Sequence, residues 1–138
     1  MQYMTMPGVQ GICPSGWYLP TDAEWTSLST ILGGESVAGG KMKSTGTIQG
    51  GTGLWYTPNT GATNESGFTG LPGGNRDLPN GIFANYNSSA LFWSSSQDNA
   101  THAWSRNLHY YYIYLGKFGS NYKACGYSIR CVKNQDAP

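Results

Sequence analysis

Few residues in this 138-residue chain have a type and spacing that could do chemistry. Its two histidines, His102 and His109, lie in runs of β-forming residues, and Asp98 is the acidic residue nearest to them in the sequence. Nothing marks one serine among many as the nucleophile of a Ser-His-Asp arrangement. No His or Cys pair has the spacing of zinc ligands, and no Asp-rich calcium loop is present. The sequence therefore predicts a protein that is not an enzyme and that has no metal or other cofactor.

Residue types suited to recognition are concentrated between Trp104 and Tyr127, a segment that holds six of the ten tyrosines. A strand points successive side chains to opposite faces, so the run from Tyr110 to Tyr112 must expose at least one ring. An exposed tyrosine offers a large, stiff contact area and a polar tip. The predicted ligand-binding residues are Ser105, Arg106, Asn107, His109, Tyr110, Tyr111, Tyr112, Tyr114, Phe118, Asn121 and Tyr122.

A plainer interpretation is that about half of these rings belong to the core or form cross-strand pairs. We expect this role for Trp104, for Tyr127 and for one or two of residues 110–114. The other tryptophans have simpler assignments, and we expect all of them in the core: Trp17, Trp25, Trp55 and Trp93.

The composition excludes several classes of protein. Charged residues are 11 % of the chain, against about 25 % in typical globular proteins. The formal net charge is +1, without the basic face that grips a phosphate backbone, so nucleic acid is not an expected partner. No stretch approaches the roughly 18 apolar residues of a membrane span, so direct membrane insertion is not expected either.

Local patterns outline the elements that would position these residues. Thr21 and Glu24 form a capping box that predicts a helix over residues 22–32, and a weaker helix is expected over 36–43 despite Gly39-Gly40. Turn signals predict mostly loop over 44–81. Strands are expected over 91–94, 102–108, 111–115 and 127–132, which gives an α+β protein with antiparallel strands at its end.

The three cysteines leave one thiol over. A bridge between Cys13 and Cys131 would close a loop of more than a hundred residues near the two ends of the chain. Three buried thiols in a reducing compartment explain the same spacing equally well.

Four segments, in this order, resemble the motifs of the Fibrobacter succinogenes major paralogous domain. The first is Gly-Ile-Cys-Pro-Ser-Gly-Trp-Tyr-Leu-Pro-Thr-Asp-Ala-Glu-Trp at 11–25. The second is Gly-Phe-Thr-Gly-Leu-Pro-Gly-Gly at 67–74, and the third is Phe-Trp-Ser-Ser-Ser at 92–96. The last is Gly-Tyr-Ser-Ile-Arg-Cys-Val at 126–132.

This resemblance implies a C-type lectin-like fold with one or two N-terminal helices, long loops and short strands. It implies one domain over 1–138 with its core at 11–133. It also favours the Cys13–Cys131 bridge, because both cysteines lie in family motifs. The family occurs on exported, often lipid-anchored or pilus-associated proteins of Bacteroidetes, which implies an extracellular or cell-surface location.

Two wider similarities bear on function. Residues 19–25 are also similar to the formylglycine-generating enzymes, in which two C-terminal cysteines hold copper; here five residues separate Cys125 from Cys131, where the enzymes have four. The scaffold is further similar to the variable proteins of diversity-generating retroelements, whose diversified segment would correspond to residues 98–127.

The function expected from the sequence is a non-catalytic, adhesin-type module of a larger exported or pilus-associated protein. Its ligand would be a protein or a glycan on another cell, phage or host surface, and its binding face at about 98–127 would be open to retroelement diversification. One alternative is a structural or assembly domain of a surface protein. A formylglycine-generating-enzyme-like oxidase is a second.

Overall fold

The described chain begins with a short strand, continues with two helices and ends with the remaining strands. The computed structural model describes residues 8–135, which include the predicted core at 11–133 but not the ends of the predicted range 1–138. Strand β1 (Trp17–Tyr18) precedes helices α1 (Asp22–Ile31) and α2 (Glu35–Met42). The later strands are β2 (Asn75–Arg76), β3 (Phe83–Ala84), β4 (Ser89–Gln97), β5 (His102–His109), β6 (Gly116–Tyr122) and β7 (Val132–Lys133). The predicted α+β class is confirmed.

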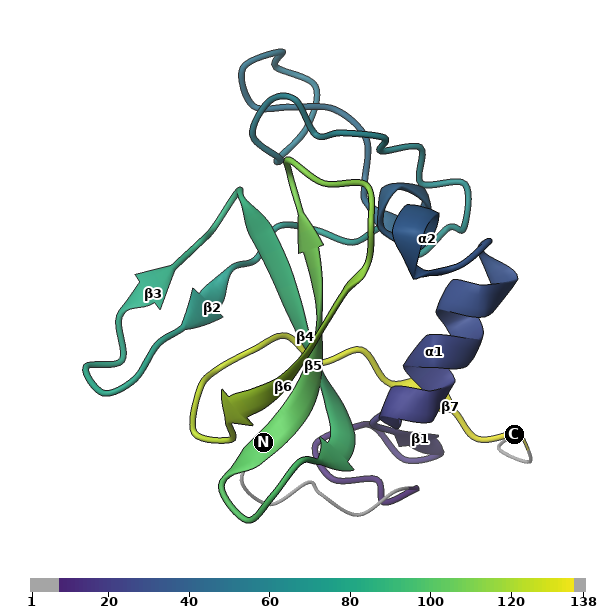
Figure 1. Ribbon diagram of the computed structural model, residues 1–138, viewed down its shortest axis with the longest axis vertical. Helices are drawn as coiled ribbons and strands as arrows, with labels where there is room; N and C mark the ends of the chain where they lie inside the picture. Colours follow the sequence, from purple (N-terminus) through teal and green to yellow (C-terminus); the bar gives the residue numbers. More distant parts are fainter. Residues whose placement is uncertain (1–7, 136–138) are drawn as a thin grey trace.

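Three small antiparallel sheets make up the strand part: β1–β7, β2–β3 and β4–β5–β6. The central sheet β4–β5–β6 has the two helices on one side and the β2–β3 hairpin on the other (Figure 1). Residues 44–74 connect α2 to β2 with isolated bridges and turns, as the turn signals predict. The loops at 44–70 and the β5–β6 connection lie at the same end of the molecule (Figure 1).

Helix α1 begins where its capping box predicts. Thr21 Oγ1 accepts a hydrogen bond from Glu24 N, and the Glu24 carboxylate accepts one from Thr21 N. This reciprocal pair satisfies two of the N–H groups that a helix start leaves without partners. The helix turns Trp25 inward, where its ring lies 5.9 Å from that of Phe68 and 5.8 Å from that of Phe92.

Helix α2 contains two buried glycines. They are required because the backbone of other segments packs closely against the helix. A Cβ on Gly39 would lie 2.2 Å from the carbonyl oxygen of Tyr114, and one on Gly40 would lie 2.4 Å from that of Gly61. Gly40 N also donates a 2.7 Å hydrogen bond to Ile113 O. These glycines lower the helix propensity of α2, but they let the β5–β6 connection rest directly on the helix.

The strands differ from the sequence-based prediction at two places. The strands expected at 91–94 and 102–108 lie within β4 and β5. Residues 111–115 were expected to form a strand and instead form the β5–β6 connection, while β6 begins at Gly116. The expected strand at 127–132 is reduced to an isolated bridge at Ser128 and to Val132, the first residue of β7. Tertiary contacts decide the first case: Leu115 N donates to Glu35 O in α2 instead of to a strand.

The core is divided into two clusters. One combines Trp25, Trp55 and Phe92 with smaller residues of α2, β4 and β5. The other surrounds Trp93, which stacks on Tyr127 with ring centroids 4.3 Å apart. The core assignment is wrong for Trp17, which is exposed in the edge strand β1 opposite Lys133. Trp104 is half-buried, with Lys117 Nζ 5.0 Å above its ring.

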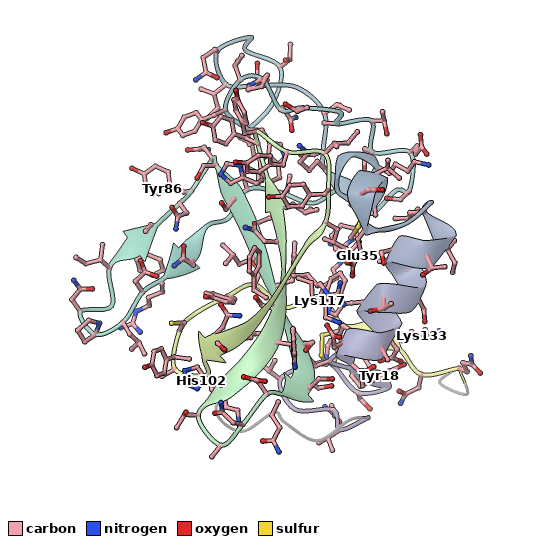
Figure 2. The ribbon with its side chains drawn as sticks, viewed as in Figure 1. Tyr18, Glu35, Tyr86, His102, Lys117 and Lys133 are labelled. Carbon is pink, nitrogen blue, oxygen red and sulfur yellow. A yellow bond between two sulfur atoms is a disulfide. The ribbon has the colours of Figure 1, made fainter. Side chains whose placement is uncertain are left out.

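A buried arginine connects both helices to the central sheet. Arg106 of β5 is fully buried, and its Nη1 contacts Glu35 Oε1 at 2.6 Å while its Nη2 contacts Asp22 Oδ1 at 2.7 Å. Lys117 of β6 adds a 2.8 Å contact to the other oxygen of Asp22. Figure 2 shows Glu35 and Lys117 in the region where the helices face the sheet.

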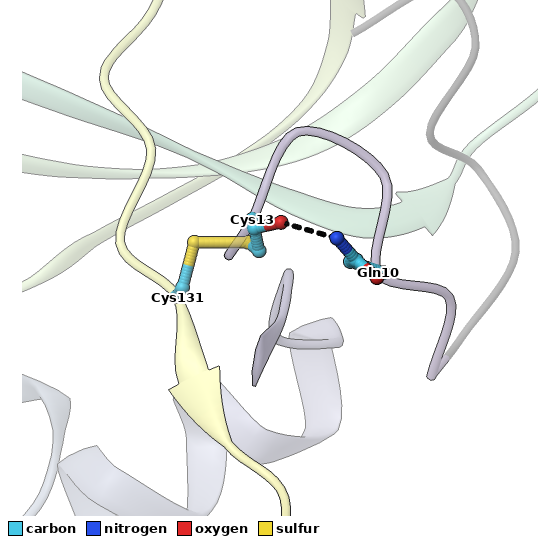
Figure 3. Close-up of a disulfide and its surroundings, with 3 residues drawn as sticks. All are labelled: Gln10, Cys13 and Cys131. Carbon is cyan, nitrogen blue, oxygen red and sulfur yellow. Dashed lines mark hydrogen bonds between the residues drawn. A yellow bond between two sulfur atoms is a disulfide. The ribbon is translucent and has the colours of Figure 1, made fainter. Parts of the chain in front are cut away.

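A disulfide joins the two end regions of the described chain. Cys13 and Cys131 are bonded, with their Cα atoms 5.9 Å apart and 118 positions apart in sequence (Figure 3). Strand β7 follows Cys131 directly and pairs with β1, so the covalent and hydrogen-bonded connections lie side by side. Cys125 is a free, half-buried thiol whose pKa is raised, chiefly by burial.

We predict that digestion without reduction yields one cross-linked pair of peptides, containing Cys13 and Cys131, in mass spectrometry. Replacing both cysteines by serine should lower the free energy of unfolding by about 4–5 kcal/mol in the chain-entropy model, because the bridge closes a very long loop in the denatured chain. Cys125→Ser is the control and should leave the cross-link in place. Detection of a Cys125–Cys131 link instead would contradict the assignment.

A second prediction concerns α2. Gly39→Ala gains about 1 kcal/mol of helix propensity but overpacks the contact with Tyr114, which typically costs about 1–3 kcal/mol and more where backbone cannot move. We expect net destabilisation in urea unfolding. The matched control is Gly73→Ala, where the added Cβ would meet only Ser128 Oγ at an ordinary 3.6 Å. A Gly39→Ala variant more stable than the unaltered protein would show that the α2 contact is not tight, because the gain in helix propensity would then be unopposed.

Candidate functional site

The most distinctive surface feature is a contiguous set of aromatic rings, called here the tyrosine array. Neighbouring ring centroids are 4.8–6.0 Å apart, from the Tyr56–Tyr110 edge contact to the stacked Tyr112–Tyr114 pair. Such separations are those of favourable aromatic pairs. The members of the array are Tyr56, His109, Tyr110, Tyr111, Tyr112 and Tyr114.

Three rings of the array face solvent. Tyr111, Tyr112 and Tyr114 are 58 %, 44 % and 42 % exposed, as expected for a connection between strands that has no sheet partner above it. Tyr110 is half-buried against the core cluster of Trp25 and Trp55 and contacts Tyr56. The prediction that some of residues 110–114 are scaffold therefore holds for Tyr110.

A buried lysine fixes the backbone beneath these rings. Lys43 follows α2 and is fully buried, and its Nζ donates to the carbonyl oxygens of Thr60, His109 and Tyr112 at 2.8, 3.0 and 2.9 Å. Its ammonium also lies 5.7 Å from the centre of the Trp55 ring. Burial lowers the pKa of Lys43 to about 8, so the group is still charged at neutral pH. One ammonium thus ties both ends of the 109–112 turn to the loop at Thr60.

His109 begins the turn as a hydrogen-bond acceptor. Its Nδ1 accepts the N–H of Tyr111 at 3.2 Å, which requires a ring without a proton on that nitrogen. Burial, together with the charge of Lys43, lowers the pKa of His109. As pH falls, the unfolded chain therefore protonates this histidine before the folded chain does. The stability that neutral His109 contributes is lost as pH falls below the ordinary pKa of 6.5.

Several predicted binding residues belong to the scaffold instead. Ser105 and Arg106 are completely buried, and Arg106 is engaged by Asp22 and Glu35, so neither side chain reaches the surface. Asn107 is half-buried, and its Oδ1 has no hydrogen-bond partner among the described residues. Asn121 Nδ2 donates to Ser105 Oγ and to two carbonyls, and its Oδ1 accepts from Tyr127, so it braces the sheet.

The remaining two lie along β6, away from the array. Phe118 and Tyr122 are exposed, and Tyr122 packs on His102 with ring centroids 4.2 Å apart. His102 begins β5 and His109 ends it, which separates them by roughly 20 Å along an extended strand. The predicted site is therefore divided, with the array at one end of the sheet and Tyr122 at the other. Sequence reasoning missed Tyr56 and Lys43, which lie in or beside the long loop region and carry no local signal.

The array offers neutral chemistry: flat ring faces, phenol hydroxyls and a histidine. Among residues 8–135, no group of three or more His, Cys, Asp or Glu side chains is placed to hold a metal ion. The helices in that range are also too short or too polar to cross a membrane. The arrangement suits stacking and hydrogen bonding to a ligand.

The fold and the surface define a class of protein: an α+β domain whose two end regions are joined by a disulfide and whose β5–β6 connection is rich in tyrosine. Residues 2–133 match the family described as the Fibrobacter succinogenes major domain, and the chain belongs to that family. Searches of curated proteins and of solved structures give no significant match. The predicted family is thus confirmed over nearly the whole chain.

The Lys43 anchor leads to a prediction. Lys43→Met keeps the aliphatic bulk but leaves three carbonyls without their donor, and we expect a loss of about 3 kcal/mol in the free energy of unfolding. In the unaltered protein, this free energy should rise with pH between about 8 and 10, because the unfolded lysine, with its ordinary pKa of 10.5, still binds the proton that the folded one releases.

The measurement is urea unfolding at several pH values for both proteins in a Cys125→Ser background, because the raised pKa of Cys125 would otherwise lower the free energy of unfolding over the same pH range. The upper pH limit of about 10 avoids the titration of Tyr127, whose pKa is raised to about 12 and whose contribution to the free energy of unfolding falls above pH 10. The rise with pH should be absent in Lys43→Met. A variant with the same stability and the same pH profile as the unaltered protein would refute the anchoring role.

Proposed function

We propose that this domain is a non-catalytic ligand-binding module and that the tyrosine array is its binding face. The observation that carries the proposal is the exposure of three adjacent tyrosine rings on a turn whose backbone is fixed by Lys43. Monomeric surfaces rarely expose contiguous aromatic rings without a use for them. Because the turn is already fixed, little conformational entropy is lost when a ligand binds to it. A tyrosine side chain also has few torsion angles that binding must fix.

The same proposal includes an extracytoplasmic location, as an adhesin-type part of an exported or pilus-associated protein. A disulfide of this kind persists in oxidising compartments, which supports that location. The pairing of β1 with β7 supports the finer assignment to a C-type lectin-like fold. Within 98–127, retroelement diversification would act on the exposed turn, while Ser105 and Arg106 would have to stay constant for packing.

The bonding state of the cysteines favours binding over oxidase chemistry. Cys131 is joined to Cys13, so Cys125 and Cys131 do not form a pair of free thiols. A structural or assembly domain is the second candidate, and the exposed rings Tyr111 and Tyr112 equally suit a contact between subunits. The ligand in the binding proposal is a protein or a glycan on another surface.

The test is capture of glycans and cell-surface proteins on arrays by the purified domain. Replacement of Tyr111, Tyr112 and Tyr114 by alanine should leave the circular dichroism unchanged and reduce capture at least tenfold, since aromatic anchors commonly contribute more than about 1.4 kcal/mol. The control is Phe83→Ala, which removes another exposed ring from the β2–β3 hairpin. Tyr122→Ala tests whether the other end of the sheet participates.

Unchanged capture by the triple variant would refute the array as the binding face. Sedimentation analysis separates the assembly alternative, because an assembly surface should give oligomers that the triple variant dissolves. Such oligomers, without capture of any arrayed ligand, would favour the assembly role.

A further inference from the structure

A groove on another part of the surface has the size of a small-molecule site. It has a volume of about 530 Å³ and lies between α1 and the C-terminal segment that includes β7. Ligand sites usually measure about 300–1,000 Å³. Figure 2 shows Tyr18 and Lys133, which both line it, beside α1. No member of the tyrosine array lines this groove.

The groove is mainly apolar. The half-buried ring of Phe68 contributes aromatic surface over the buried Trp25, 5.9 Å away, and Leu28 and Ile31 extend the apolar surface along α1. Ile31 is 82 % exposed, although it lies beside this apolar surface. A helix residue of this kind gains from a partner that removes it from water.

One wall carries a positioned guanidinium. Arg130 Cζ lies 4.4 Å from the centre of the Phe68 ring, and its Nη2 donates to Phe68 O at 2.6 Å. Nε and Nη1 of Arg130 have no side-chain hydrogen bond within residues 8–135. The stacked ring and the carbonyl fix the plane of the guanidinium, and the second N–H of Nη2 leaves one two-donor edge free to match the two oxygens of a carboxylate.

The positive charge of this wall is not neutralised by the described residues. Neither Arg130 nor Lys133 has an ion pair among them. Glu24 also lines the groove, but its carboxylate already accepts from Tyr18 and from Thr21. These hydrogen bonds lower the pKa of Glu24 against the opposing effect of burial, and they occupy its oxygens.

We propose that the groove binds a small amphipathic carboxylate. Its apolar body lies along Phe68, Leu28 and Ile31, and its carboxylate contacts the free edge of Arg130, with Lys133 adding charge. The occupant follows from the combination of an apolar channel with a cation that has a fixed orientation and no carboxylate partner among residues 8–135. This site is separate from the tyrosine array, so either proposal can fail alone.

The test uses decanoate and its uncharged counterpart decanamide, each below its aggregation concentration, titrated into the ¹⁵N-labelled protein. We expect decanoate to shift the Trp25 indole resonance and the amides of residues 27–31 and 130–133, with residues 109–114 unaffected. Decanamide should bind about fivefold more weakly, the size expected for an exposed ion pair.

Two variants locate the contacts. Arg130→Gln should lower the affinity for decanoate to that for decanamide and leave decanamide binding unchanged, whereas Ile31→Asn should weaken both. Lys41→Gln is the control, because it removes one positive charge from α2 outside the groove. The proposal is overturned if the two ligands bind equally, if neither binds, or if the shifts appear elsewhere.

Discussion

The ammonium of Lys43 is the interaction on which the rest of the surface depends. Placing a charge in the interior is unfavourable unless every donor finds an acceptor, and its three N–H donors meet three carbonyl oxygens. Those oxygens belong to the loop at Thr60, to the last residue of β5 and to the β5–β6 connection. Gly39 and Gly40 let the β5–β6 connection approach α2 closely, so contacts with the helix set the position of this connection. The exposed rings are thereby held without help from neighbouring strands.

Arg106 has the corresponding role at the centre of the molecule. It joins the first residue of each helix to β5, where Asp22 and Glu35 both accept from it. A chain with so few charged residues thus places two of its eight cationic side chains fully in the interior. Amides and hydroxyls are left to hydrate much of the outside. Breaking a buried pair of this kind leaves a charge without a partner, which makes these positions intolerant of change.

Local signals were sufficient wherever the decisive contacts are local. The capping box located α1, and the alternating runs located β4 and β5. The tyrosine run failed as a strand because the carbonyl of Tyr112 is taken by Lys43 and the N–H of Leu115 by Glu35. Arg106 was mistaken for a surface residue because its carboxylate partners lie more than seventy positions away in sequence. Tyr56 joined the array through the same kind of distant contact.

The disulfide also has a mechanical consequence. Tension applied between the segments that flank Cys13 and Cys131 passes through the sulfur–sulfur bond, so the chain between them stays outside the load path. The sheets β2–β3 and β4–β5–β6, the core cluster of Trp25 and the Lys43 anchor then experience no stretching force from the ends, whereas β7, which follows Cys131, does. A domain built in this way keeps its tyrosine array in the same arrangement when its ends are pulled apart, for as long as the bridge is oxidised.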